Sequence, residues 1–120
     1  MTQAKFDLED RLLDFAVRVI RVTESMKRTL AGMSVADQFW RSGSSSFGHH
    51  GEMEDAESRD DFVPKRRICY KELREARGWL CLVPHALVAA KVALLVGLVA
   101  EADELGRIFT ASIRTAENKI

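Results

Sequence analysis

The chain is poor in the residues that break or crosslink a polypeptide. Its 120 residues include two prolines, seven glycines and two cysteines, Cys69 and Cys81. β-Rich folds need more turn punctuation than this, so the composition favours an all-α fold. The cysteines lie twelve residues apart on one expected helix. That is about 18 Å of rise, too far for a disulfide, so we expect both thiols to be free and partly buried in a reducing compartment.

The chain also lacks net charge and long apolar runs. Eighteen basic and eighteen acidic side chains cancel, whereas a strong nucleic-acid binder carries a basic excess. The longest apolar region, residues 86–100, contains Lys91 and is too short to span a bilayer comfortably. Residues 1–7 lack the apolar core of a secretion signal, so we expect a cytoplasmic protein.

Helix-forming residues dominate what remains, and the length fits one domain over residues 1–120. Apolar residues at three- and four-residue spacing predict helices over about residues 8–30, 34–57, 60–88 and 90–117. Gly32 is expected to stop the first helix, and Ser34 to cap the second. Pro64 is expected in the first turn of the third helix, where it is tolerated. Short connections favour an antiparallel up-down-up-down four-helix bundle.

Three places leave the helix pattern open. Residues 42–48 (SGSSSFG) look like a linker by composition, or like a tight-packing stretch inside a continuous second helix. Pro84 should end the third helix near Leu82 or kink it, and we expect a kink with a continuation towards Val88. Gly97 and Gly106 are expected to weaken the fourth helix slightly while allowing close packing.

Several of these helices are apolar on more than one side. Val17 and Ile20 widen the stripe of the first helix, and Val92, Val96 and Val99 add apolar surface to the fourth. A helix that is apolar on two sides usually has a second partner beyond its own bundle, which predicts a homo-oligomer. The alternative is that these residues are scattered surface hydrophobes.

A set of short segments, taken together, resembles a known family. The segments are 42–45 (SGSS), 54–62 (EDAESRDDF), 71–80 (KELREARGWL), 102–105 (ADEL) and 108–109 (IF). In order and spacing the chain resembles the bacterial four-helix-bundle proteins of the 23S ribosomal RNA intervening-sequence type. The resemblance covers nearly the whole chain. His49, His50, Pro64 and Pro84 depart from the residues usual in that family.

The resemblance implies a left-handed antiparallel bundle that is a subunit of a ring, typically a homopentamer, with no enzymatic activity. A similar bundle is the accessory protein of diversity-generating retroelements, where its partners are a reverse transcriptase and nucleic acid. Those accessory proteins are strongly basic, whereas this chain is neutral.

A basic strip on the third helix is the main candidate contact site. Arg67, Lys71 and Arg74 share one face by their spacing and could bind the phosphates of RNA or DNA. The alternative is ion pairing with nearby acidic residues, among them Glu101, Asp103 and Glu104 on the fourth helix. Trp40 and Trp79 are interpreted as packing anchors of the core or an interface.

Metal and catalytic sites have weaker patterns. His50 and Glu54 have the spacing of a helical ligand pair, but no full ligand set accompanies them, and a polar, exposed half of the second helix is the alternative. The glutamates at 72, 75, 101 and 104 lack the histidines of a di-iron bundle. We therefore expect no catalytic residues, cofactor, metal, membrane contact or small-molecule substrate. The expected function is a non-enzymatic, ring-forming scaffold, or alternatively a nucleic-acid accessory protein.

Overall fold

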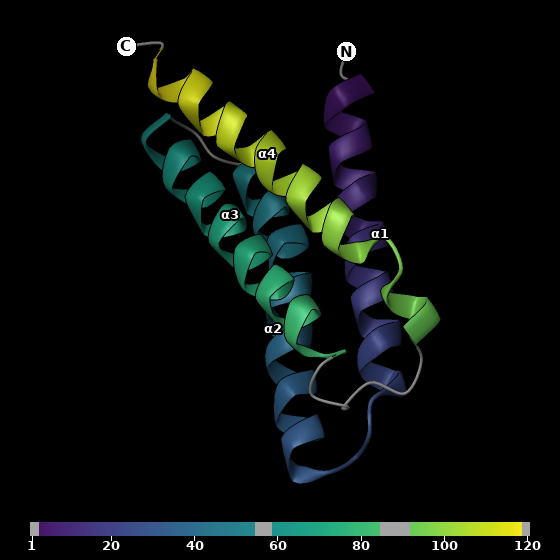
Figure 1. The fold of residues 1–120 in the computed structure, drawn as a ribbon. Helices are drawn as coiled ribbons and strands as arrows, with labels where there is room; N and C mark the ends of the chain where they lie inside the picture. The colour runs from purple at the N-terminus through teal and green to yellow at the C-terminus, as the bar shows by residue number, and fades with distance from the viewer. Residues whose placement is uncertain (1–2, 55–58, 85–91, 119–120) are drawn as a thin grey trace.

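The described part of the chain forms four α-helices and one 3₁₀ turn. The computed structural model describes residues 3–54, 59–84 and 92–118, with side chains for residues 8–51, 63–84 and 93–118. The helices are α1 (Gln3–Ser25), α2 (Leu30–Glu54), α3 (Arg59–Leu82) and α4 (Leu98–Glu117), with the 3₁₀ turn η1 (Val92–Leu95) before α4. Each helix runs opposite to the one before it, and the start of α1 and the end of α4 lie at the same end of the bundle (Figure 1). The predicted antiparallel all-α bundle is confirmed; its left-handedness stays a prediction.

The first connection differs from the prediction. α1 ends at Ser25 rather than Leu30, where the Thr23 and Ser25 hydroxyls donate to carbonyl oxygens one turn back. α2 then begins at Leu30, and the Thr29 hydroxyl accepts a 3.0 Å hydrogen bond from the Gly32 N–H. Thr29 is therefore the cap, not Ser34. Gly32 does not stop α1; it lies in the first turn of α2, where a Cβ would come 2.1 Å from the Lys27 carbonyl oxygen.

α2 is continuous across its small residues. The hydroxyls of Ser42 and Ser44 donate to carbonyl oxygens four residues back, at 3.0 and 2.7 Å. Both hydroxyls therefore find their hydrogen-bond acceptors within α2 itself. Gly43 is buried, and a Cβ there would lie 2.7 Å from a methyl carbon of Val19. The stretch is thus a close contact between α2 and α1, as the tight-packing alternative predicted.

Of the two prolines near α3, Pro64 lies inside the helix and Pro84 lies just after its end. Pro64 is the sixth residue of the helix, beyond the first turn where it was expected, so it removes one interior backbone hydrogen bond. At the other end α3 stops at Leu82, and the Val83 N–H donates to the Trp79 carbonyl at 2.9 Å. Pro84 lies in a turn, so α3 ends near Leu82, one of the two outcomes expected of Pro84. The proposed continuation towards Val88 lies outside the described residues.

The fourth predicted helix is divided in two. Gly97 has φ of +80°, a left-handed conformation that ends η1 and precedes α4. Arg18 of α1 donates to the carbonyl oxygen of the preceding Val96 at 2.9 Å. α4 therefore begins at Leu98, and Gly97 is a joint rather than a slightly weak helical residue.

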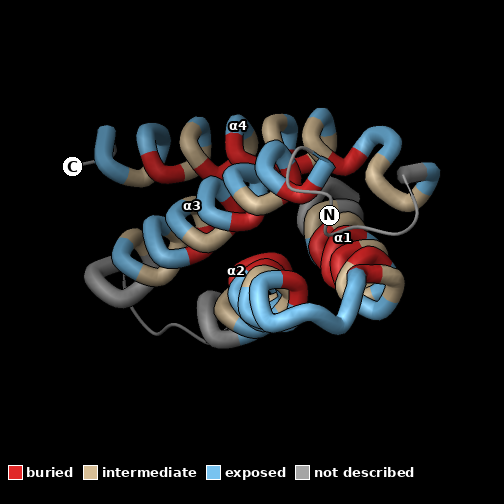
Figure 2. Tube along the Cα trace, turned by 60° about the horizontal axis from the view of Figure 1, so that its bottom comes forward, coloured by how far each residue is buried: buried red, intermediate tan, exposed pale blue. Residues whose placement is uncertain are grey.

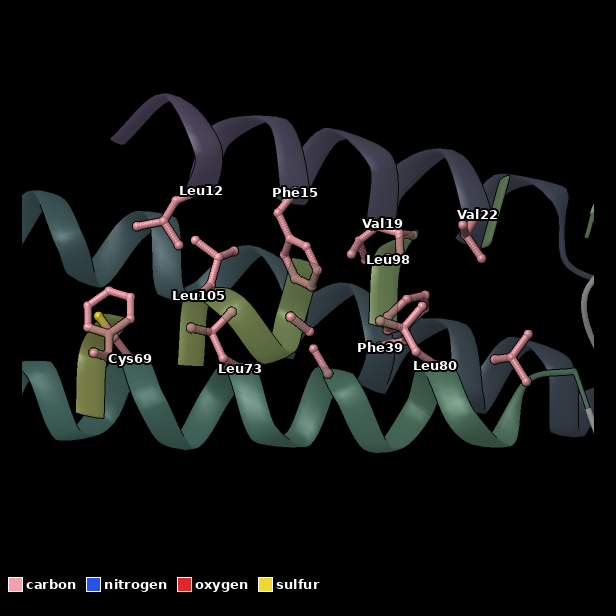
Figure 3. Packing of buried hydrophobic residues seen from close by; sticks show 14 of the residues in the cluster. Leu12, Phe15, Val19, Val22, Phe39, Cys69, Leu73, Leu80, Leu98 and Leu105 are labelled. Carbon is pink, nitrogen blue, oxygen red and sulfur yellow. The ribbon is translucent and has the colours of Figure 1, made fainter. Parts of the chain in front are cut away.

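The core lies where the periodicity placed it on α1. Figure 3 shows Leu12, Phe15, Val19 and Val22 facing side chains of the other three helices, and all four are fully buried. On α3 and α4 apolar residues at the helical spacing are also buried, namely Leu73, Leu80, Leu98, Leu105 and Phe109. Ile68 of α3 is apolar but 40% exposed, whereas Phe39 of α2 is fully buried.

The helices contact one another mainly in chain order. α2 packs against α1 and α3, and α3 packs against α4, whereas α1 and α4 touch along a short stretch only. Figure 2 shows α2 and α4 on opposite sides of the bundle, with buried positions turned inwards and exposed positions outwards. The described chain measures 49 × 25 × 20 Å. The outer face of α2 and the surface between α3 and α4 are therefore open to solvent.

Candidate interaction surfaces

Large apolar side chains lie on the outside of α2. Leu30 is 91% exposed, Met33 57%, Trp40 45% and Phe47 36%. Met33, Trp40 and Phe47 are seven residues apart, so they point in nearly the same direction from the helix, with a drift of about 20° per step. We call these four residues the α2 stripe. It extends for roughly 25 Å along the helix.

A hollow lies beside the N-terminal part of the α2 stripe. It measures about 320 Å³ and lies between the end of α1 and the start of α2. Met26, Met33 and Trp40 line it together with Lys27, Asp37 and Gly32. Apolar walls with charges of both signs at the rim are typical of a protein contact surface rather than of a phosphate site.

A second hollow lies between α3 and α4. This groove measures about 420 Å³. Its charged and polar walls are Tyr70, Arg74 and Arg77 from α3 and Asp103, Arg107 and Thr110 from α4. Three guanidinium groups against one carboxylate leave it positive, although the chain as a whole is neutral. We call it the α3–α4 groove.

Hydrogen bonds hold part of the groove in place. Arg77 donates to Asp103 across the two helices, and this pairing raises the pKa of Arg77. Arg74 donates to the Tyr70 hydroxyl at 3.2 Å, which lowers the pKa of Tyr70. The Arg74 guanidinium also lies 5.8 Å from the centre of the Tyr70 ring. Hydrogen bonds thus orient Tyr70 and two of the three arginines.

The predicted basic strip is exposed but not uniform. Arg67, Lys71 and Arg74 are all exposed on α3. Arg67 donates to Glu117 of α4, and Arg74 is held by Tyr70. Arg67 is therefore ion-paired, whereas the side chains of Lys71 and Arg74 remain accessible to solvent. Nothing in the structure tests whether the strip binds nucleic acid, and its role stays a prediction.

The acidic residues of α4 serve to join helices. Arg11 of α1 donates to both carboxylate oxygens of Glu101, at 3.0 and 2.9 Å, and lies 3.1 Å from a carboxylate oxygen of Glu104. These contacts raise the pKa of Arg11, the hydrogen bond with Glu101 being the largest cause. A bidentate pair of this kind fixes orientation as well as distance. It links α1 to α4, which otherwise touch little.

The two histidines of α2 differ in burial. His49 is half-buried, but His50 is 2% exposed and its Nδ1 lies 3.9 Å from a carboxylate oxygen of Glu9. The expected exposed, polar half of α2 is therefore wrong at His50. The side chain of Glu54, its proposed metal partner, is outside the described residues. Within the described ranges no three His, Cys, Asp or Glu side chains gather in a way that could hold a metal ion.

The cysteines also differ. Cys69 is fully buried and lies 3.6 Å from the Ser46 carbonyl oxygen, whereas Cys81 is exposed. Neither thiol is in a disulfide, as predicted, but Cys81 is exposed rather than partly buried. Trp79 is half-buried against the core, and its indole N–H donates to Glu75 at 3.4 Å, while Trp40 belongs to the exposed α2 stripe.

Sequence reasoning did not find either hollow as such. The seven-residue spacing of Met33, Trp40 and Phe47 is a signal that could have revealed the α2 stripe. Arg107 could not have been joined to Arg74 and Arg77 from the sequence, because that requires the register between α3 and α4. Among the described helices, none combines the length and apolar character needed to cross a bilayer.

The fold and these surfaces define an antiparallel four-helix bundle whose distinctive features lie on its outside. A solved relative has the same fold: a crystal structure of a protein of unknown function from the S23 ribosomal protein family of Bacteroides thetaiotaomicron. It has 26% sequence identity and a TM-score of 0.77, over 89% of this chain and 95% of that one. The family resemblance predicted from the sequence is confirmed by this match. No protein-family model and no curated protein sequence matches the chain.

Proposed function

We propose that the protein is a non-enzymatic, cytoplasmic scaffold whose working form is a ring of identical subunits. The α2 stripe is the observation that carries this proposal. Met33, Trp40 and Phe47 point in nearly the same direction from α2, with Leu30 at the start of the helix, and other sides of α2 already pack against α1 and α3. A row of large exposed apolar side chains is unfavourable in a protein that stays monomeric, and a partner that covers it gains hydrophobic free energy.

A second copy of this chain is the occupant that fits best. The net charge is zero, so two copies approach without electrostatic repulsion. The hollow beside Met33 and Trp40 also carries Lys27 and Asp37, charges of both signs that suit a surface of equally mixed charge. A partner with charges of both signs can pair with Lys27 and with Asp37, whereas a polyanion would be repelled by Asp37.

A ring requires two different contact surfaces on each subunit. When one surface of a subunit meets a different surface of the next, the subunits form a ring if the rotation between neighbours closes, and an open filament if it does not. α1 offers the second surface, because Leu13 is 46% exposed, and Val17 and Ile20, four and seven residues further on, are half-buried on the same side of the helix. The family resemblance implies five subunits, and we adopt that number as the expectation.

Native mass spectrometry with light scattering at micromolar concentration tests the assembly. The wild-type chain should give a ring of about five subunits. Replacing Trp40 and Met33 together by Glu should give a folded monomer, because charges placed in an apolar contact are costly to bury. Val96→Glu is the matched control, since Val96 is 71% exposed but lies away from α2. A wild-type monomer, or a control as disruptive as the double variant, contradicts the proposal.

The alternative function is a nucleic-acid accessory protein that uses Arg67, Lys71 and Arg74. Its support is the exposure of all three side chains on one helix and the ribosomal-protein name of the family of the solved relative. Against it stand the zero net charge and the pairing of Arg67 with Glu117. Filter binding of RNA and DNA at low and moderate salt distinguishes the two functions, because phosphate contacts weaken steeply as salt rises.

A further inference from the structure

The α3–α4 groove concentrates positive charge on a neutral protein. Arg74, Arg77 and Arg107 reach it from two helices, and Asp103 supplies the single opposing carboxylate, a surplus of two positive charges. Asp103 is already engaged by Arg77. Arg107, by contrast, makes no hydrogen bond or ion pair with any residue that the structure describes. The guanidinium group of Arg107 is therefore available to bind an anionic ligand.

Its shape suits a small ligand rather than a flat surface contact. A volume of about 420 Å³ is within the range of small-molecule sites. Two glycines keep it open: a Cβ at Gly78 would meet nothing within 4 Å, and one at Gly106 would only touch the Tyr70 ring at 3.7 Å. Tyr70 and Thr110 add hydroxyl groups beside the guanidinium groups.

We propose that the α3–α4 groove binds the dianionic phosphate group of a small phosphate monoester. Guanidinium groups match phosphate oxygens in pairs, and a monoester carries nearly two negative charges at neutral pH, which equals the surplus in the groove. Arg107 and Arg74 hold the phosphate oxygens, while Arg77 stays with Asp103. The site is independent of the proposed ring contact, because it lies on α3 and α4 and not on α2.

Isothermal titration calorimetry with phenyl phosphate, a monoester, and dimethyl phosphate, a diester, tests the site. Phenyl phosphate should bind saturably and at least about tenfold more tightly than the diester. Arg107→Gln and Arg74→Gln should each weaken it at least about tenfold, the usual loss for one charged hydrogen bond. Arg21→Gln, an exposed arginine of α1, is the matched control and should bind as the wild type does.

A substitution that leaves the net charge unchanged distinguishes binding inside the groove from general electrostatic attraction to the protein. Gly78→Leu places a side chain in open space inside the groove, so it should abolish binding while the helical circular dichroism is retained. No saturable binding by the wild type, equal affinity for both esters, unchanged binding by Gly78→Leu, or an equal loss in Arg21→Gln would each overturn the proposal. Equal affinity would point instead to the phosphodiester backbone of a nucleic acid.

Discussion

At the scale of single residues, the close packing of α2 against α1 depends on the absence of a side chain at Gly43. A Cβ at this position would lie 2.7 and 2.8 Å from the two methyl carbons of Val19. Val19 is fully buried, and a β-branched side chain in a helix has one preferred rotamer, so it cannot turn away. The small residues of α2 therefore determine how closely α1 approaches.

Replacing Gly43 by Ala should accordingly destabilise the fold. The expected loss is about 1–3 kcal/mol of unfolding free energy, the usual cost of overpacking a core. Gly48→Ala is the matched control in the same helix, because a Cβ there meets nothing within 4 Å. The control should gain about 0.5–1 kcal/mol from the better helix propensity of Ala. Urea unfolding followed by circular dichroism measures both, and a stable Gly43→Ala protein would show that α1 and α2 are farther apart.

Tyr70 gives a second prediction at this scale, because it is the only tyrosine of the chain. Its pKa lies below the ordinary 10.0, chiefly because Arg74 donates a hydrogen bond to its hydroxyl. Arg74→Gln should raise the pKa towards that value, as measured by the ultraviolet absorbance of tyrosinate. Arg21→Gln should leave it unchanged, and a titration curve identical in all three proteins would contradict the Arg74–Tyr70 contact.

The same shift has a defined effect on stability. The folded protein releases the Tyr70 proton at a lower pH than the unfolded chain does, so stability rises with pH only between those two pKa values. At neutral pH both states keep the proton, and the shift contributes nothing. Stability measured around pH 7 should therefore be insensitive to this group.

At the scale of the elements, the helices were predictable and their junctions were not. The periodicity of Leu12, Phe15 and Val19 located α1 because buried positions recur with the helical period. The start of α2 was placed at Ser34, four residues too late, because Thr29 and Ser34 are equally good caps in a sequence. Only the hydrogen bond from Gly32 to Thr29 decides between them.

The surfaces were less predictable than the helices, for a similar reason. His50 looked polar and exposed, but it is buried because α1 covers that side of α2, with Glu9 nearby. The Arg67–Lys71–Arg74 strip was visible because it lies on one helix. The groove was not visible, since Arg107 reaches it from the other side of a helix pair whose register the sequence does not reveal.

Gly97 gives the prediction that belongs to the elements. It joins η1 to α4 with φ of +80°, which costs an L-residue with a Cβ roughly 1–2 kcal/mol. Gly97→Ala should lower the unfolding free energy by about that amount. Gly78→Ala, in the exposed interior of α3, should raise it by about 0.5–1 kcal/mol. If thermal unfolding gives both variants the same sign, α4 does not begin at a left-handed joint.

At the scale of the whole molecule, each helix packs mainly against its neighbours in the sequence. Two surfaces of the bundle, on α2 and between α3 and α4, are open to solvent. α2 and α4 lie on opposite sides of the bundle (Figure 2); α2 carries the exposed α2 stripe, and α4 lines the positively charged α3–α4 groove together with α3. Two unlike surfaces allow the protein to assemble through one and bind through the other.

Assembly through the α2 stripe should also make stability depend on protein concentration. Subunits that associate when folded shift the equilibrium away from the unfolded chain, so the melting temperature should rise as concentration increases. The variant with Glu at both Met33 and Trp40 should melt at one temperature whatever its concentration. Calorimetry over a hundredfold dilution series measures this, and a concentration-independent wild type would contradict a reversible assembly.

The unequal burial of the two thiols has a practical consequence for observing this protein at work. Cys81 is exposed and lies 3.8 Å from a guanidinium nitrogen of Arg77, at the edge of the groove, whereas Cys69 is closed inside the core. A maleimide fluorophore should therefore attach to the natural sequence at one site without any engineered cysteine. The dye would stand beside Arg77, so its emission would report ligand entry in real time and, in a ring, the distance between neighbouring subunits.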